Sequence, residues 1–408
     1  MKNVALIHEW LTTYAGSERV VEQMLLQYPE SDLYAVANIL SDKDREFLRG
    51  KEPTTSFIQK LPFLKKFLRH YLPLMPMAVE QWDLSAYDVI LSSNHAVAKG
   101  VICGPDQLHV SYVHTPIRYA WEFQAQYLRE SKLTWGVRSM LTRMILHYMR
   151  IWDNVSSTRV DAFVANSQFI ANRIQKCYGR TAEVIYPPVD VDAFAPNYNK
   201  ENYYIAASRL VPYKRVDLIV EAFRLMPDRK LLVVGDGPMF KTLKANCPDN
   251  VELLGYLPHE KMLRLMQGAK AFVFAAEEDF GITSVEAQAC ATPVIAYGRG
   301  GSLETVVEGV TGCFFEEQVP ESVAAAVDAF EQQQSQFDLQ ATRKHAEGFR
   351  PERFRAELAE FIDSEWRKFV QHRRRRPKRS ITSSVPDPLN CPVVKSPDLV
   401  NFAGVSSK

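Results

Sequence analysis

Residues Glu277 to Glu286 read EEDFGITSVE, and this stretch decides the fold prediction. Its carboxylates Glu278 and Glu286 have seven residues between them. The apolar run before it, Ala271 to Ala276, is typical of a buried parallel strand, and a helical pattern from Ser284 to Cys290 follows. The acids therefore lie where the carboxyl end of a strand passes through a loop into a helix, which is where open α/β sheets bind ligands.

The chemistry of this loop suits a nucleotide sugar. Free backbone N–H groups and the helix dipole attract a phosphate at a helix N-terminus, and carboxylates accept hydrogen bonds from sugar hydroxyls. Two structural interpretations compete with a binding role. Thr283 and Glu286 also have the spacing of a capping box with Thr283 as the N-cap, and Glu278 is also compatible with a solvated loop acid.

Apolar runs bounded by turn residues alternate with helical patterns along the chain, which predicts an α/β fold with two doubly wound parallel sheets. The strands of the first sheet are expected at Val4–Ile7, Val89–Leu91, Val110–Val113, Ala162–Ala165 and Val184–Tyr186. Those of the second are expected at Tyr204–Ala207, Leu231–Val234, Val251–Leu254, Ala271–Ala276 and Val294–Ala296.

The chain of 408 residues is long enough for two domains, and the polar, Pro-containing stretch at 190–203 separates the two series of strands. We expect a first domain at 1–190, a second at 191–352, an amphipathic helix at 353–370 and a basic, disordered tail at 371–408.

The charge distribution argues against general nucleic-acid binding. Residues 371–408 contain eight Lys/Arg and two acids and therefore carry a net charge of +6. Because the whole chain carries +1, the remaining residues carry −5. A mildly acidic folded body does not match the basic surface that nucleic acid requires. The tail itself is compatible with an electrostatic membrane tether or with a solvated extension.

Cysteine usage and hydropathy indicate a cytoplasmic protein. The six cysteines form no CxxC pair and no zinc pattern, which is typical of reduced thiols. No apolar run approaches the roughly 18 residues that a membrane span requires, and the N-terminus lacks the layout of a signal peptide. We expect no metal and no cofactor.

Two cations, Arg209 and Lys214, follow the expected strand Tyr204–Ala207. Fixed cations at a carboxyl edge stabilise the negative charge of a departing diphosphate. Taken singly, each is also compatible with a surface cation that pairs with an acid.

In the first domain, Gly16 follows the first strand and lets the backbone approach a ligand closely, although a plain turn with Ser17 as N-cap is the alternative. His114 follows a buried strand and could bond a sugar hydroxyl or serve only a structural role. The turn Gly235-Asp236-Gly237 resembles half of a dinucleotide fingerprint, but Phe240 occupies the place of its third glycine.

Residues 57–79 contain four Lys/Arg and no acid, with apolar residues at helical spacing. A basic amphipathic helix of this kind lies in an anionic membrane surface. The alternative is a helix whose apolar stripe packs on its own domain.

Together these features resemble the retaining GT-B glycosyltransferases of family 4, over most of residues 1–370. The family pattern is carried by Glu278 and Glu286, the Arg209/Lys214 pair, Gly16 and the block GGSLETV (Gly300–Val306). The stretches HEWLTTYAGSERV (His8–Val20), YVHTPIRYAW (Tyr112–Trp121) and VIYPPVDVDAF (Val184–Phe194) are similar to a bacterial mannosyltransferase-like branch that builds surface polysaccharides such as lipopolysaccharide. Two positions depart from the pattern: Asp279 stands where glycine is common, and Ser17 where a small residue or alanine is common.

The resemblance implies two Rossmann-like domains facing a central cleft, and a role for each matching residue. Glu286 would hold the ribose, Arg209 and Lys214 the diphosphate, and Gly255 and Tyr256 the base. Glu278 and the backbone of Gly281, Ile282 and Thr283 would contact the donor sugar and phosphates. His114 would lie by the reacting face of the sugar, and Gly16 would let its loop approach the diphosphate.

The leading hypothesis is transfer of a hexose, mannose from GDP-mannose, to a lipid-linked or polysaccharide acceptor, without a metal, at the inner face of the cell membrane. A UDP-sugar donor is one alternative. A nucleotide-sugar-binding protein without turnover is another, and an NAD-type oxidoreductase is a third, weakened by the incomplete glycine fingerprint.

Overall fold

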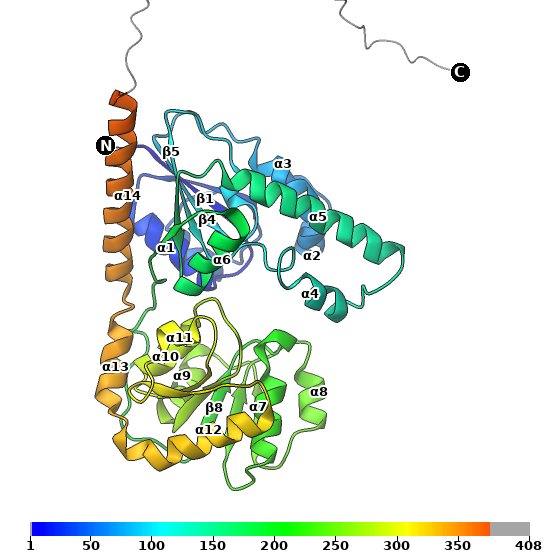
Figure 1. The fold of residues 1–408 in the computed structure, drawn as a ribbon, viewed down its shortest axis with the longest axis vertical. Helices are drawn as coiled ribbons and strands as arrows, with labels where there is room; N and C mark the ends of the chain where they lie inside the picture. The colour runs from blue at the N-terminus through cyan, green and yellow to red at the C-terminus, as the bar shows by residue number, and fades with distance from the viewer. Residues whose placement is uncertain (1, 376–408) are drawn as a thin grey trace, which may run out of the picture. The chain divides into compact units, whose positions relative to one another are not determined.

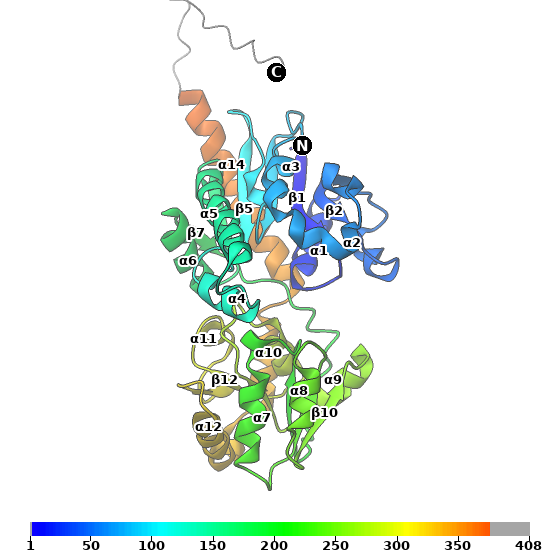
Figure 2. The same cartoon turned by 90° about the vertical axis from the view of Figure 1, so that its right-hand side faces the viewer.

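The first seven strands form one parallel sheet in the computed structural model, which describes residues 2–375. Its order is β3-β2-β1-β4-β5-β6-β7, and Figure 2 shows β2, β1, β5 and β7 side by side in that order. The bounds are β1 Val4–Leu11, β2 Asp32–Asn38, β3 Thr54–Thr55, β4 Val89–Asn94, β5 Leu108–Val113, β6 Ala162–Ala165 and β7 Ala182–Val184. We call this sheet and its helices the first domain.

The remaining strands form a second parallel sheet of order β10-β9-β8-β11-β12-β13, which with its helices is the second domain (Figure 1). The bounds are β8 Tyr204–Ala207, β9 Leu231–Val234, β10 Val251–Gly255, β11 Ala271–Phe274, β12 Val294–Tyr297 and β13 Gly312–Phe315. Most of these strands are buried along their whole length, and helices cover both faces, so each sheet is the middle layer of a three-layer domain. The predicted pair of doubly wound parallel sheets is confirmed.

Each sheet has a switch point where the strand order reverses. In the first sheet it lies between β1 and β4, and in the second between β8 and β11. Crevices at the carboxyl ends of such strand pairs bind ligands in doubly wound proteins. A binding site is therefore expected at the loops that follow these four strands.

Helices follow nearly every strand. Their bounds are α1 Gly16–Gln27, α2 Leu64–Phe67, α3 Met75–Val79, α4 Gln124–Glu130, α5 Val137–Ser157, α6 Gln168–Tyr178, α7 Val216–Arg224, α8 Phe240–Ala245, α9 His259–Gly268, α10 Ile282–Ala289, α11 Ser302–Thr305, α12 Pro320–Gln333, α13 Leu339–Glu347 and α14 Pro351–Arg375.

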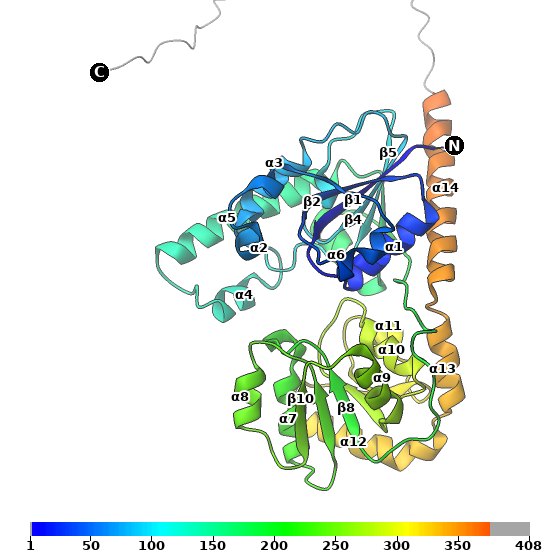
Figure 3. The same cartoon turned by 180° about the vertical axis from the view of Figure 1, so that it is seen from behind.

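Helix α14 follows the second domain in sequence but lies beside the first (Figure 3). The ring of Phe354 meets that of Tyr112 on β5, with the centroids 5.6 Å apart. Further along, Arg355 donates to Gln23 of α1, and Asp363 pairs with Lys2. Both sheets and α14 as far as Trp366 belong to one compact unit. The predicted basic tail extends past residue 375, outside the described residues.

Residues 57–79 do not form the single amphipathic helix that the sequence predicts. They form four short pieces: the 3₁₀ helices Phe57–Lys60 and Leu68–Leu74, and the helices α2 and α3. Pro62, Pro73 and Pro76 explain the breaks, because proline lacks the N–H that a continuous helix needs. Leu64, Leu68 and Met75 are buried in the core of the first domain, together with side chains of α5.

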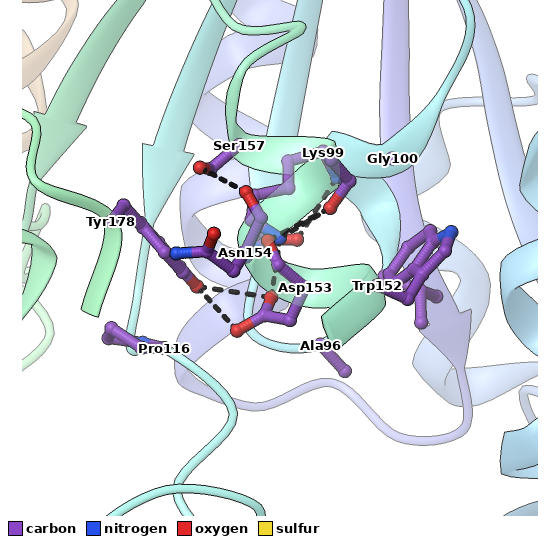
Figure 4. Close-up of polar contacts among 12 residues, drawn as sticks. Ala96, Lys99, Gly100, Pro116, Trp152, Asp153, Asn154, Ser157 and Tyr178 are labelled. Atoms are coloured by element: carbon purple, nitrogen blue, oxygen red, sulfur yellow. Dashed lines mark hydrogen bonds and ion pairs between the residues drawn. The ribbon is translucent and has the colours of Figure 1, made fainter. Parts of the chain in front are cut away.

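A fully buried ion pair fastens α5 to the first sheet (Figure 4). Lys99, after β4, pairs with Asp153 of α5, and neither side chain is exposed. Tyr178 of α6 also donates to Asp153, at 3.0 Å. Trp121, from the loop after β5, donates to the same carboxylate at 2.7 Å. A buried pair is stable only when such hydrogen bonds satisfy its remaining atoms. This network fixes the loop that follows His114.

Among the residues that the structure describes, no helix is both long enough and apolar enough to span a bilayer.

Candidate active site

A cavity of about 330 Å³ lies between the two domains, and we call it the central cavity. Seven of the predicted site residues line it: Gly16, His114, Lys214, Glu278, Gly281, Ile282 and Thr283. Gly16 is the first residue of α1, shortly after β1, and Glu278 belongs to the loop after β11, so segments that follow strands at both switch points meet here. The approach is close, because a Cβ added to Gly16 would lie 3.1 Å from the side chain of Ile282.

A second cavity, of about 470 Å³, lies within the second domain, and we call it the second-domain cavity. It is lined by the predicted residues Arg209, Tyr256, Glu286 and Thr283, together with the turn Gly235-Asp236. Thr283 lines both cavities, so the two adjoin at the start of α10. Gly255 is placed beside this cavity through its carbonyl, which accepts a hydrogen bond of 2.8 Å from the N–H of Gly235.

A third cavity, of about 600 Å³, opens on the other side of Arg209, and we call it the Tyr127 cavity. Arg118, Tyr119, Phe123 and Tyr127 of the first domain face Arg209 and Tyr213 of the second across it. Three cavities, of which neighbouring ones share Thr283 or Arg209 in their walls, therefore surround the cations and acids at the switch point of the second sheet.

The start of α10 differs from the capping box that the sequence suggests. The helix begins at Ile282, and its N-cap is Gly281 in a left-handed conformation with φ of 89°. A residue with a Cβ is strained at this φ, so glycine is required. Thr283 as N-cap is therefore wrong, since it lies in the first turn of the helix. The Glu286 carboxylate is then free of the capping role and bonds elsewhere.

Glu286 receives an arginine from the first domain. Its side chain is buried to 7% exposure, and Arg19 of α1 donates to its Oε1 at 2.6 Å. Sequence reasoning missed Arg19 because these two residues are 267 positions apart. The expected Ser17 N-cap is also wrong: Ala15 is the N-cap of α1, and Glu18 accepts from its N–H at 3.2 Å.

Lys214 and Glu278 form an ion pair of 2.7 Å at the wall of the central cavity, and both side chains are largely buried. Lys214 lies in a 3₁₀ turn after β8, which places it beside the neighbouring strand end of β11. A cation held in this way is oriented before a ligand arrives, so it needs little rearrangement to meet a phosphate.

Asp279, the position that departs from the family pattern, is held by two arginines of the first domain. Arg118 pairs with its carboxylate, and Arg173 of α6 donates to it at 3.0 Å. Arg173 also donates to Thr115 at 2.8 Å and pairs with Glu122. This cluster joins the loop after β5 to the loop after β11. Neither arginine was predicted, since nothing in the local sequence indicates a contact between the domains.

His114 is half-buried at the central cavity and shares a hydroxyl with another histidine. Its Nε2 lies 2.8 Å from Ser93 Oγ, which lies 3.2 Å from the Nδ1 of His8. Burial lowers the pKa of His114 to about 3. The imidazole is therefore neutral near pH 7 and is suited to exchanging hydrogen bonds with a hydroxyl.

His95, which also lines the central cavity, is placed by Glu9 of β1. The Glu9 carboxylate accepts N–H bonds of 2.7 to 3.1 Å from the four residues His95 to Ala98. Burial lowers the pKa of His95 as well. Nothing in the local sequence indicates this contact, because Glu9 lies in an ordinary strand pattern.

The glycine pair Gly300-Gly301 packs closely against the backbone of the loop after β11. Gly301 donates to the carbonyl of Glu278 at 2.8 Å, and a Cβ at this position would lie 2.4 Å from the backbone of Phe280. The adjacent Glu304 accepts from the N–H groups of Gln168 and Phe169, at 2.6 and 2.9 Å, at the start of α6. A carboxylate at a helix N-terminus is favourable, so this contact also ties the domains together.

Within residues 2–375, the structure shows no group of three or more His, Cys, Asp or Glu side chains placed to hold a metal ion.

Two family models match the chain, one in each domain. The model described as Glycosyltransferase Family 4 matches residues 14–193, and the model described as Glycosyl transferases group 1 matches residues 191–347. Together they cover the central cavity from both sides. The chain belongs to glycosyltransferase family 4.

Curated relatives of this family 4 chain match over less than half of it. A GDP-mannose-dependent alpha-(1-6)-phosphatidylinositol monomannoside mannosyltransferase of Mycolicibacterium smegmatis is 32% identical over 196 residues, which is 40% of this chain and 50% of the relative. A D-inositol 3-phosphate glycosyltransferase of a Mycobacterium species is 30% identical over 180 residues, which is 37% of this chain and 40% of the relative. The chain thus spans about half the length of the curated relatives it matches.

Among solved structures, the Anabaena protein HepE in complex with UDP and glucose superposes with a TM-score of 0.63. The match covers 89% of this chain and 100% of HepE at 16% identity. This likeness shows the fold, which is GT-B, as the family resemblance implied.

Proposed function

We propose that this protein transfers a hexose, mannose from GDP-mannose, to a lipid-linked or polysaccharide acceptor with retention of configuration. The observation that carries the proposal is that Thr283 lines two cavities of different chemistry. One holds a cation, an acid and a free helix N-terminus between the domains, and the other holds Glu286 and Tyr256 in the second domain. A sugar diphosphate and a nucleoside need these two environments, joined end to end.

The roles follow from position and charge. The nucleoside would occupy the second-domain cavity, with its ribose hydroxyls donating to Glu286 and its base beside Tyr256 and Gly255. The diphosphate would lie at the N-terminus of α10, between Arg209, Lys214 and the N–H groups of Ile282 and Thr283. The sugar would enter the central cavity beside Glu278 and His114.

These groups account for the chemistry without a metal. As the bond between the sugar and the diphosphate breaks, negative charge grows on the phosphate. Arg209 and Lys214 therefore stabilise the transition state more than they stabilise the ground state. The leaving phosphate oxygen takes the proton of the acceptor hydroxyl on the same face of the sugar, which retains the configuration. The neutral imidazole of His114 holds a sugar hydroxyl in place. Burial between the domains excludes water, whose attack would hydrolyse the donor.

The acceptor would enter through the Tyr127 cavity. This space is the largest of the three, at about 600 Å³, and reaches Arg209 from the first domain. Its aromatic residues Tyr119, Phe123 and Tyr127 suit the faces of sugar rings, and Arg69 and Arg118 suit a phosphate on a lipid-linked acceptor.

Identity between parts of this chain and GDP-mannose-dependent relatives favours GDP-mannose as the donor. UDP-sugars are the alternative, since HepE was solved with UDP and glucose.

Thermal unfolding with GDP, UDP, ADP and NAD tests the donor, because a ligand that binds only the folded state raises the melting temperature. A selective rise with GDP supports the proposal, and a selective rise with UDP changes the sugar. A rise with NAD alone overturns it.

Incubation with GDP-mannose and a lipid extract, followed by determination of the anomeric configuration of the product, then tests transfer and retention. Nucleotide binding without transfer to any acceptor would instead indicate a binding protein without turnover.

A further inference from the structure

Helix α5 carries an apolar stripe on its exposed face. Its members recur every three or four residues, which places them on one side of the helix: Val137, Met140, Leu141, Met144, Tyr148, Ile151 and Val155. Val137 is 79% exposed, Met140 and Met144 are each 60% exposed, and Trp135, just before the helix, is 92% exposed. Seven exposed apolar side chains in a row on one helix mark an interaction surface.

The opposite face of α5 explains why the stripe is outside. Leu146, Met149 and Trp152 pack into the core of the first domain, and Asp153 takes part in the buried ion pair with Lys99. The helix is therefore fixed in rotation, and its second apolar face cannot turn inward. Figures 1 and 3 both show α5 extending beyond the sheet, on the flank away from α14 and beside α2, α3 and α4.

The charge around the stripe is positive. The sequence has no acid from Ser131 to Trp152, and Lys132, Arg138 and Arg143 are exposed there. On the neighbouring pieces of 57–79, Phe63 is 75% exposed, and Lys65 and Lys66 are exposed beside it. Apolar side chains flanked by cations fit a surface that is apolar inside and anionic outside.

We propose that the α5 stripe, with Trp135, is a docking surface for an anionic lipid membrane. Two other occupants fit the charges less well. A second copy of the chain packed stripe to stripe would bring these cations against each other. The chain's own segment 376–408 carries five Lys/Arg and two acids, so it has the same sign as the surface.

The docking surface lies close to the Tyr127 cavity along the chain, which relates docking to the proposed entry of the acceptor. Tyr127 and Glu130 of α4 line that cavity, and only residues 131–136 separate α4 from α5. A membrane under α5 therefore lies beside the proposed entrance of a lipid-linked acceptor. This last step rests on the proposed function, whereas the docking itself does not.

Leu141→Glu in the full chain tests the proposal, with Leu225→Glu as its control. The two leucines are 56% and 52% exposed, and Leu225 lies in the second domain, so the same change is made at equal exposure. Flotation with vesicles of phosphatidylcholine, with and without phosphatidylglycerol, measures binding. We expect the wild type to bind the anionic vesicles, Leu141→Glu to bind at least about tenfold more weakly, and Leu225→Glu to bind as the wild type does.

The tryptophan beside the stripe offers a second readout. Anionic vesicles should shift the fluorescence of the wild type to the blue, and Trp135→Phe should lose most of the shift, because Trp135 is exposed whereas Trp152, also of α5, packs into the core. Equal vesicle binding by Leu141→Glu and the wild type would overturn the proposal. The proposal would also be overturned if Leu141→Glu altered the sedimentation of the lipid-free protein and left vesicle binding unchanged. That result would indicate an interface between copies of the chain. GDP-induced stabilisation of the same variants reports on the donor site separately.

Discussion

The two domains face each other with opposite charges. The second domain presents four acids from the loop after β11 and from α10 and α11, whereas the first presents three arginines and the N-terminus of α6. The acids are Glu278, Asp279, Glu286 and Glu304, and the arginines are Arg19, Arg118 and Arg173. Only Glu278 finds its cation, Lys214, within its own domain. The proposed function assigns the groups for a nucleotide sugar to the second domain, and the first domain supplies the cations and N–H groups that join the two domains.

Two kinds of contact can be separated on this basis. Arg19 pairs with Glu286, which we propose to bind the ribose, so on this proposal the contact competes with the donor. The arginines on Asp279 and the α6 N-terminus on Glu304 contact acids that we do not assign to the donor, so they hold the domains together whether or not a donor is bound.

The largest effect is expected from Lys214→Ala. Removing a preorganised cation from the developing charge should lower kcat for transfer by about 100-fold or more. Steady-state assays with the donor measure it, and Lys241→Ala, an exposed lysine of the same domain, is the control. A kcat within twofold of the wild type would place Lys214 outside the reaction.

Asp279→Asn should act on domain closure rather than on chemistry. It leaves Arg118 and Arg173 without their charged partner between the domains, which favours the open arrangement. We expect the KM for the donor to rise about tenfold with a smaller change in kcat, and small-angle scattering to show an expanded protein. Asp249→Asn, an exposed acid of the second domain, is the control. Unchanged KM and unchanged scattering together would refute a closing role.

Buried histidines of the first domain should make the protein acid-sensitive. Burial lowers the pKa of His109 and His114 to about 3, against about 6.5 in the unfolded chain. Below pH 6.5 these imidazoles therefore bind protons in the unfolded state but not in the folded state. The free energy of unfolding has its full value above pH 6.5. It falls as the pH drops toward 3, by on the order of 1.4 kcal/mol per pH unit for each histidine. Urea unfolding across this range measures the slope.

His109 lies away from the cavities and bonds Ser92 at 2.9 Å, so His109→Asn isolates the effect from the site. The slope should decrease in this variant but not in His70→Asn, where the histidine is exposed. Identical slopes in all three proteins would contradict the assignment.

The smallest effect is expected from Arg19→Met. Because Arg19 competes with the ribose for Glu286, its removal should tighten GDP binding, by about two- to fivefold. Calorimetric titration measures the change, and Arg45→Met, from the exposed pair with Glu52 at 2.8 Å, is the control. Weaker GDP binding in Arg19→Met would show that Arg19 contacts the ligand instead.

Much of the second domain could be predicted because its strands are short apolar runs that end in polar loops. The bounds of β8 and β9 are those expected, and Lys214, Glu278 and Glu286 follow strands whose ends must share one edge of the sheet. In the first domain, β2 and α5 were missed. Strand β2 is only partly apolar, and the exposed stripe of α5 gives an apolar pattern without saying which face is buried.

The partners of the site acids could not be predicted from sequence. Arg19 and Glu286 are 267 residues apart, and Arg173 and Asp279 are 106 apart, so only the folded domains bring them together. The same holds for the Thr283 capping box. Its spacing is satisfied locally, but the left-handed Gly281 begins the helix two residues earlier and leaves Glu286 to Arg19.

The central claim is that one nucleotide sugar contacts both domains across the central cavity. Hydrogen exchange of the full chain, with and without GDP-mannose, tests it most directly. We expect slower exchange in two places at once: the segment from Thr12 to Arg19 in the first domain, which includes the start of α1, and the segment from Glu278 to Glu286 in the second. Protection confined to the second domain, or protection in neither segment at saturating donor, would contradict the account.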